Sequence, residues 1–167
     1  MTSLWLEADD TSLSNPLDTA EQLCLERDWA FDRPHPQELF ADCNGNWCNY
    51  RLALEWNEGF GSLTLSCAME TRLPPRMAEK VYPLLSKINS RLWLGHFELP
   101  EEHPYLTFRY TLLSRNATVT LEQLEDVLDI ILSECERFYP AFQSMLWGDR
   151  SADDVLKLTL LEAQGQA

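Results

Sequence analysis

Residues 38–56, ELFADCNGNWCNYRLALEW, alternate apolar and polar side chains on both sides of a central Asn-Gly pair. The apolar members are Leu39, Ala41 and Cys43 before the pair and Cys48, Tyr50, Leu52, Leu54 and Trp56 after it. A repeat of two residues is typical of a strand with one buried face. Because Asn-Gly readily adopts the two positive φ angles of a type I′ turn, the stretch predicts a hairpin whose two-residue loop is Asn44 and Gly45.

The hairpin contains two cysteines, Cys43 and Cys48, which raises the question of a metal or redox site. With a two-residue loop, Cys43 pairs with Asn46 and Ala41 pairs with Cys48, so both thiols point to the apolar face. They are then diagonal neighbours, roughly 7–8 Å apart, which is too far for a disulfide. No CxxC or HxxxH pair elsewhere in the chain would complete a zinc site. We therefore interpret the two cysteines as part of a turn and expect no metal.

Periodic patterns on either side of this hairpin predict the remaining elements. In chain order they are a short helix from Pro16, the two strands of the hairpin, a third strand over residues 62–69, a helix over 77–92, a second hairpin from 96–99 and 104–113, and helices that follow Thr120 and Ser151. The resulting order, α-βββ-α-ββ-α-α, describes an α+β domain in which an antiparallel sheet has helices packed on one face.

The chain has 167 residues and a formal net charge of −14, from 13 Lys and Arg against 27 Asp and Glu. Its length suits a single domain, which we assign to residues 15–167 after a flexible arm of residues 1–14. An acidic surface repels phosphate backbones and anionic lipids, so nucleic acid and membrane are not expected as partners. Five cysteines without a framework spacing, and an N-terminus unlike a signal peptide, favour a reducing, cytoplasmic location.

Sequence motifs that carry catalysis are missing. The chain contains no Gly-x-Ser-x-Gly, no phosphate-binding glycine pattern, and three widely spaced histidines. We therefore expect no enzymatic activity and no cofactor. The alternative is a small-ligand sensor, or an enzyme of unrecognised type, with a pocket between sheet and helices that uses His96 or Arg109.

The polar face of the predicted sheet is the first candidate binding surface. Serine and threonine hydroxyls offer hydrogen bonds there, aromatic rings offer contact area, and arginines offer anion contacts. We predict partner-binding roles for Trp47, Arg51, Tyr105 and Arg109. Two alternatives are an ordinary solvated sheet face and capture of an extended peptide by an exposed edge strand.

The second candidate surface is the aromatic segment CERFYPAFQSMLWG, residues 135–148. It holds more aromatic side chains than one narrow helix stripe accommodates, and large apolar patches on a small domain usually belong to an interface. We predict self-association into a homodimer through Phe138, Phe142 and Trp147. The alternative is a helix that is buried on more than one side.

Six segments together resemble a known bacterial family. They are NPLDTAEQL, DWAF, INSRLWLGHFEL, FRYTLL, LEDVLDIILSECERFYPAFQSMLWG and ADDVLKLTLLEAQGQA, spread from Asn15 to the C-terminus. These segments are similar to the YbjN family, described as sensory transduction regulators. The resemblance implies a fold similar to the chaperones of type III secretion, which are small, acidic, usually homodimeric and bind extended segments of other proteins. The loop in EEHPYLT, residues 101–107, departs from the family pattern because it is longer or richer in proline.

The family has no agreed biochemical activity and no catalytic motif that could be carried over, in agreement with the motif search. Similarity of fold does not transfer function. We therefore predict a non-enzymatic module that binds a protein or peptide in a regulatory or chaperone-like role. A nucleic-acid regulator is a further alternative, suggested only by the family description, and the net charge of −14 argues against it.

Overall fold

The computed structural model describes residues 14–114 and 118–164. Its helices are α1 (Pro16–Glu26), α2 (Ala78–Asn89), α3 (Leu121–Trp147) and α4 (Ala152–Gln164), and a short 3-10 helix, η1 (Pro75–Met77), precedes α2. Its strands are β1 (Ala30–His35), β2 (Glu38–Asn44), β3 (Asn49–Asn57), β4 (Ser62–Arg72), β5 (His96–Glu98) and β6 (Tyr105–Leu113). Of the predicted arm, residues 1–14, only Ser14 is among the described residues.

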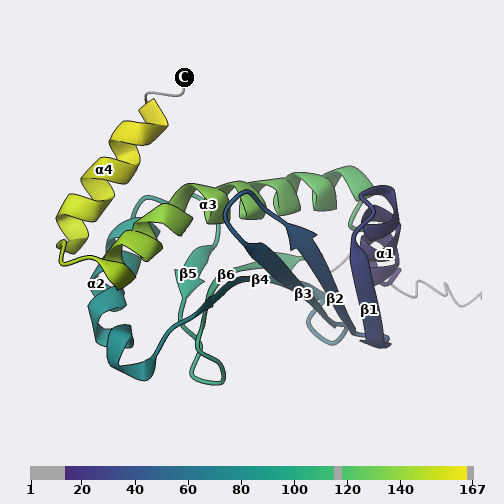
Figure 1. The fold of residues 1–167 in the computed structure, drawn as a ribbon. Helices are drawn as coiled ribbons and strands as arrows, with labels where there is room; N and C mark the ends of the chain where they lie inside the picture. Colours follow the sequence, from purple (N-terminus) through teal and green to yellow (C-terminus); the bar gives the residue numbers. More distant parts are fainter. Residues whose placement is uncertain (1–13, 115–117, 165–167) are drawn as a thin grey trace, which may run out of the picture.

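All six strands form one antiparallel sheet in the order β1-β2-β3-β4-β6-β5. In Figure 1, α3 runs along one side of the sheet, with α1 near one end of it and α2 and α4 near the other. The predicted α+β class, an antiparallel sheet with helices packed on one face, is confirmed.

The sequence does not predict strand β1. The alternation of apolar and polar side chains is unclear there because Asp32, Arg33 and Pro34 fall within its six residues. It lies at the edge of the sheet, where charged residues and proline are tolerated because one row of backbone groups needs no partner strand. Arg33 reaches Asp18 and Glu21 of α1 at 2.7 and 3.0 Å. A tertiary contact therefore helps to define β1 where the local pattern does not.

The hairpin of β2 and β3 is confirmed, but its predicted two-residue loop is wrong. Asn44 pairs with Asn49, and Cys43 pairs with Tyr50 instead of Asn46. The loop is residues 45–48, and a hydrogen bond of 3.0 Å from the N–H of Gly45 to the carbonyl of Cys48 closes it. Cys43 is buried between the sheet and the helices, whereas Cys48 lies half-buried in the loop.

Contacts with α3 explain the longer loop. The carboxylate of Glu136 accepts a hydrogen bond from the backbone N–H of Asn46 at 2.9 Å. The ring of Trp47 stacks on the ring of Tyr139. Both partners come from a helix about ninety residues further along the chain, so a pattern within the hairpin does not indicate them. The loop conformation is set by the helix it touches.

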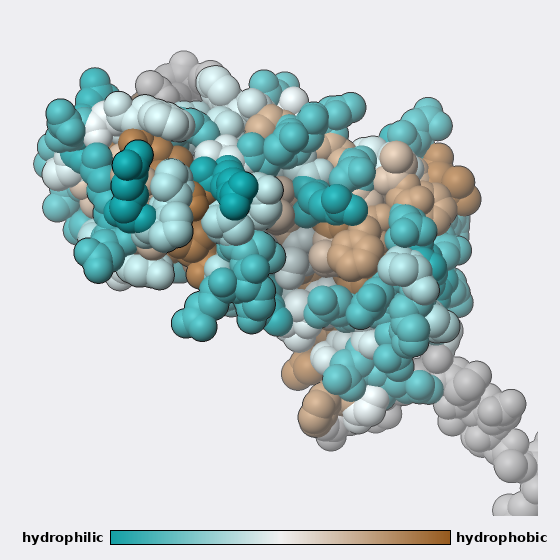
Figure 2. Space-filling view, turned by 60° about the horizontal axis from the view of Figure 1, so that its bottom comes forward, coloured by the Kyte–Doolittle hydropathy of each residue, from teal (hydrophilic) through white to brown (hydrophobic). Residues whose placement is uncertain are grey.

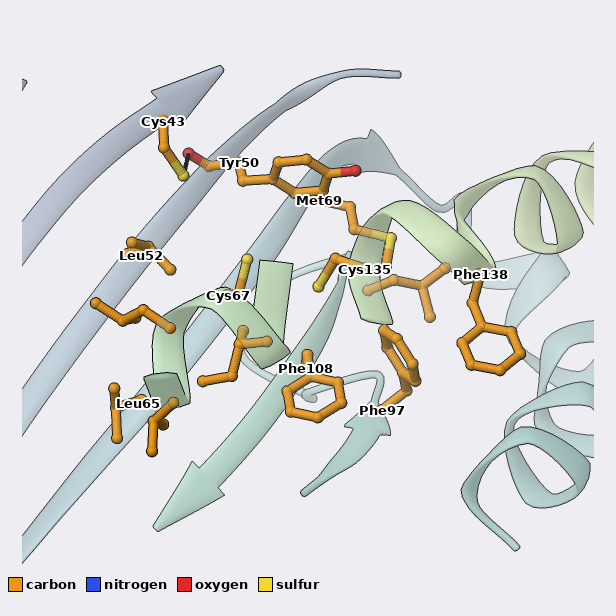
Figure 3. Packing of buried hydrophobic residues seen from close by; sticks show 14 of the residues in the cluster. Cys43, Tyr50, Leu52, Leu65, Cys67, Met69, Phe97, Phe108, Cys135 and Phe138 are labelled. Atoms are coloured by element: carbon orange, nitrogen blue, oxygen red, sulfur yellow. Dashed lines mark hydrogen bonds between the residues drawn. The ribbon is translucent and has the colours of Figure 1, made fainter. Parts of the chain in front are cut away.

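Apolar side chains fill the space between the sheet and the helices (Figure 3). The thiol of Cys43 donates a hydrogen bond to the carbonyl of Tyr50 at 3.6 Å, so this cysteine belongs to the core. Phe97 of β5 makes edge-on ring contacts, and its partners are Phe108, Phe138 and Phe142 at centroid distances of 4.9, 5.9 and 5.2 Å. This packing joins β5 and β6 to the second half of α3 through apolar side chains.

Candidate functional site

The face of the sheet turned away from the helices is the open face. Alternation along the strands sends every second residue to it. Its central members are Phe40, Asp42, Arg51, Ala53, Thr64, Ser66, Ala68, Thr107, Arg109 and Thr111. Figure 2 brings the underside of Figure 1 forward and so looks toward this face. In that view hydrophobic side chains lie in separate places among hydrophilic ones, as expected for a mixed surface.

The strand register sets the spacing of the predicted arginines. Arg51 lies in one cross-strand row with Ala68 and Thr107. Arg109 lies in the next row, opposite Ser66. Directly opposed residues in an antiparallel pair have Cβ atoms about 4.5–5.5 Å apart. The two arginines are thus on one face but are separated by the width of β4.

Both arginines already have carboxylate neighbours. Arg51 lies 4.0 Å from Asp42 and 5.9 Å from the centre of the Phe40 ring. Arg109 lies 3.4 Å from Glu98. Exposed ion pairs of this kind contribute about 0–1 kcal/mol. A partner could therefore exchange them for its own carboxylates at little cost.

A hollow of about 450 Å³ lies at one end of the open face. Its lining includes Asp42, Asn44, Asn49, Arg51, Ala68, Glu70 and Tyr105. Two of the four predicted partner-binding residues, Arg51 and Tyr105, are thus brought together in one place. Arg109 stays on the same face outside the hollow. The carboxylates of Asp42 and Glu70 were not selected from the sequence, because isolated acidic residues on a strand carry no motif.

Trp47 does not lie on the open face. It is 58% exposed in the loop of the β2–β3 hairpin, and its ring lies 6.4 Å from that of Tyr139 with 13° between the planes. The sequence assigned it to the sheet because a two-residue loop would have placed it in β3. The structure therefore separates Trp47 from Arg51, Tyr105 and Arg109.

The three residues predicted for self-association are also separated. Phe138 and Phe142 are each 1% exposed and pack inside this chain against Phe97. Trp147, at the end of α3, is 81% exposed, and its indole N–H donates to the side-chain oxygen of Gln143 at 2.9 Å. The prediction that Phe138, Phe142 and Trp147 share one self-association face is wrong, because α3 is buried on more than one side. Trp147 alone stays available to a second copy.

The described cysteines are free, and several have raised pKa values. Burial raises the pKa of Cys24 to about 11 and that of Cys43 to about 12. Contact with the Cys135 thiol, together with burial, raises the pKa of Cys67 well above its usual value. A thiol that keeps its proton at neutral pH is a weak nucleophile and metal ligand. Within residues 14–114 and 118–164, no group of three or more His, Cys, Asp or Glu could hold a metal ion.

A second hollow, of about 660 Å³, lies beyond the end of β4. It is bounded by the segment 72–82 and by the β5–β6 loop, residues 99–104. The sequence predicts a helix from residue 77 and a hairpin loop near residues 100–104, but it assigns no site to either segment. The available signal was a cluster of prolines on each side, at 74–75 and at 100 and 104. Proximity of the two clusters depends on the β4–β6 pairing, which a local pattern does not show.

None of the helices in the described part of the chain has the length and apolar character that a membrane crossing requires.

The sequence of the chain matches a known bacterial family. The model of the YbjN family, described as "Putative bacterial sensory transduction regulator", matches residues 16–144. This chain belongs to the YbjN family. The match begins with α1, includes every strand and ends in the last turn of α3, so that α4 lies outside it.

Solved structures similar to this YbjN-family chain include that of YbjN from E. coli, "a putative transcription regulator". The two chains are 16% identical with a TM-score of 0.52, over 72% of this chain and 85% of that chain. The ExsC–ExsE complex is also similar, at 16% identity and a TM-score of 0.39, over 59% of this chain and 72% of that chain. The first likeness supports the fold alone, and the second is too slight to support an argument. A search of the curated proteins finds no match.

Proposed function

We propose that this YbjN-family chain is a non-enzymatic module that docks a protein or peptide on its open face, in a regulatory or chaperone-like role. The observation that supports the proposal is that helices cover only one face of the sheet. Helices pack on one face, while the other presents hydroxyl, aromatic and guanidinium groups around a hollow. We also propose that the module acts in the cytoplasm, where its free thiols stay reduced.

The side chains of the open face suit contact with another protein. Thr64 and Thr111 hydrogen-bond to each other across β4 and β6 at 3.2 Å, and each hydroxyl keeps further capacity for a partner. Phe40 supplies a ring beside the exposed guanidinium of Arg51. Aromatic residues and arginine are enriched where proteins bind one another. The proposal therefore rests on the mixture of these groups rather than on one motif.

The test places one bulky residue at the centre of the open face. Ser66, which lies between Ala53 of β3 and Arg109 of β6, is changed to tryptophan. The matched control is Gln123→Trp, an equal insertion at an exposed position on α3, on the other side of the sheet. Circular dichroism and thermal unfolding verify that both variants fold.

Each protein is cross-linked in cytosol from its own bacterium, and the captured proteins are identified by mass spectrometry. We expect a partner that wild type and Gln123→Trp recover and Ser66→Trp loses. Recovery of the same partner by all three proteins would place docking away from the open face. Recovery of nothing above background would count against a binding module altogether.

A further inference from the structure

The two hollows adjoin beside the paired residues Arg72 and Tyr105. The hollow of about 660 Å³ is lined by Arg72, and the hollow of about 450 Å³ is lined by Tyr105. These two residues are register partners in β4 and β6. The rings of Tyr105 and His103, which line different hollows, lie 5.8 Å apart. The two hollows are therefore neighbours, and together they are here called the groove.

Prolines make stiff walls at one end of the groove. They are Pro74 and Pro75 on one side and Pro100 and Pro104 on the other. A proline ring restricts φ and removes the backbone N–H, so these four residues present apolar rings and no N–H donor. A hydrogen bond of 2.7 Å from the N–H of Leu73 to the carbonyl of Pro104 joins the two walls. This part of the groove is therefore formed before any partner binds.

His103 and Tyr82 line the same end. The Nδ1 atom of His103 is buried without a hydrogen-bond partner among the described residues. A buried polar atom without a partner costs free energy that a suitably placed ligand group can recover. Tyr82 of α2 is 52% exposed and lines the same hollow. The groove thus has an aromatic edge next to its proline walls.

The charge of the groove is negative. Its carboxylates are Asp42, Glu70, Glu101 and Glu102, and its guanidinium groups are Arg51 and Arg72. Arg51 lies near Asp42, while no ion pair joins Glu70 to a described residue. The whole chain is acidic as well, at −14. Both the local and the overall charge favour a basic ligand.

We propose that the groove binds an extended, basic segment of a protein partner, an inference that rests on the proposed function. A proline or aliphatic side chain of the segment enters the proline-walled hollow beside Tyr82. A lysine or arginine of the same segment enters the open-face hollow, between the carboxylate of Glu70 and the ring of Tyr105. Proline-rich segments bind aromatic-lined grooves because their extended conformation is preformed, and a cation gains from an aromatic face and a carboxylate together.

The test selects ligands without assuming a sequence. A displayed library of random peptides, each about twelve residues long and so able to span the groove when extended, is selected on the purified full-length chain. Selected peptides are then synthesised with a fluorescent label, and their dissociation constants are measured by anisotropy. We expect peptides that combine lysine or arginine with proline or aliphatic residues, and affinities that fall as salt rises.

Two variants locate the bound peptide, each with a control. Glu70→Lys reverses the charge in the open-face hollow, and Glu55→Lys makes the same change on the same face outside the groove. Tyr82→Ala removes the ring from the proline-walled hollow, and Phe60→Ala removes an exposed ring elsewhere. We expect Glu70→Lys and Tyr82→Ala each to weaken binding at least about tenfold, and the two controls to change it less than about twofold.

Other outcomes overturn the inference. The inference is wrong if the selection yields no binders or yields binders that lack a basic residue. It is also wrong if Glu70→Lys and Glu55→Lys weaken binding equally. The proposed function is tested separately from the groove. If a cellular partner is lost with Ser66→Trp but kept with both Glu70→Lys and Tyr82→Ala, docking on the open face stands and the groove is not its site.

Discussion

Trp47 in the β2–β3 loop lies stacked on Tyr139 of α3, with ring centroids 6.4 Å apart and 13° between the ring planes. The contact fastens the tip of a hairpin to a helix that lies on the covered side of the sheet. It gives Trp47 a contact within the chain, while the partner-binding role expected from the sequence stays a prediction.

Trp47→Ala should therefore lower the free energy of unfolding. Loss of the ring pair should cost about 0.5–1.5 kcal/mol beyond the lost buried area, measured by urea denaturation. Phe60→Ala is the control, since Phe60 is 68% exposed and makes no ring contact with a described residue; its effect should stay within about 0.5 kcal/mol. Unchanged stability combined with loss of a cellular partner would instead show that Trp47 is a contact residue.

Gly45 begins the same loop and is closely surrounded. A Cβ atom there would overlap the carboxylate of Glu136 and the ring of Tyr50. Gly45→Ala should destabilise the protein by about 1–3 kcal/mol, since the neighbours must move. In Gly59→Ala the nearest atom to the new Cβ is Asn57 Oδ1, at an ordinary 3.5 Å, so stability should change little. Equal melting temperatures for the two variants would contradict the described loop.

Phe142 and Trp147 should respond to mutation in opposite ways. Phe142→Ala empties a site in the core and should cost about 3–5 kcal/mol of stability. Trp147→Ala removes an exposed side chain, so the effect on unfolding should be within about 0.5 kcal/mol. If the predicted homodimer forms through Trp147, light scattering should detect a dimer for wild type and a monomer for Trp147→Ala. A dimer that survives this change would remove Trp147 from the interface.

The buried thiols predict weaker folding in alkaline solution. Burial raises the pKa of Cys43 from 9.0 to about 12. Below about pH 9 both states keep the proton, but above it only the unfolded chain releases it, so the free energy of unfolding falls as pH rises. The loss from one such group is at most about 1.4 kcal/mol per pH unit. It continues until the pH reaches the pKa of the folded state.

Urea denaturation of wild type and Cys43→Ala between about pH 8 and about pH 11 measures this effect. The variant should be less stable at neutral pH because a buried group is lost, but its stability should decline less steeply with pH. Cys48→Ala provides a comparison from the half-buried thiol of the loop. Parallel curves for wild type and Cys43→Ala would show that this thiol does not contribute.

The sequence by itself determined the elements that depend on near neighbours. Alternation predicted the buried faces of β2, β3 and β4, since side chains two residues apart share a face whatever the rest of the chain does. The prediction that a helix follows Thr120 is confirmed, and the Thr120 hydroxyl accepts a hydrogen bond from Gln123 N–H three residues later, at 3.1 Å. The open face and the positions of Arg51 and Arg109 on it followed from the same alternation.

Tertiary structure alone decided the features that join distant segments. Glu136 and Tyr139 set the length of the hairpin loop and the place of Trp47. Phe97 buries two rings of α3 that a helical pattern could not assign to core or surface. Pairing of Arg72 with Tyr105 brings two proline clusters to one groove. Each of these features depends on contacts between residues far apart in the chain. A local sequence pattern carries no information about which distant side chain will pack against it.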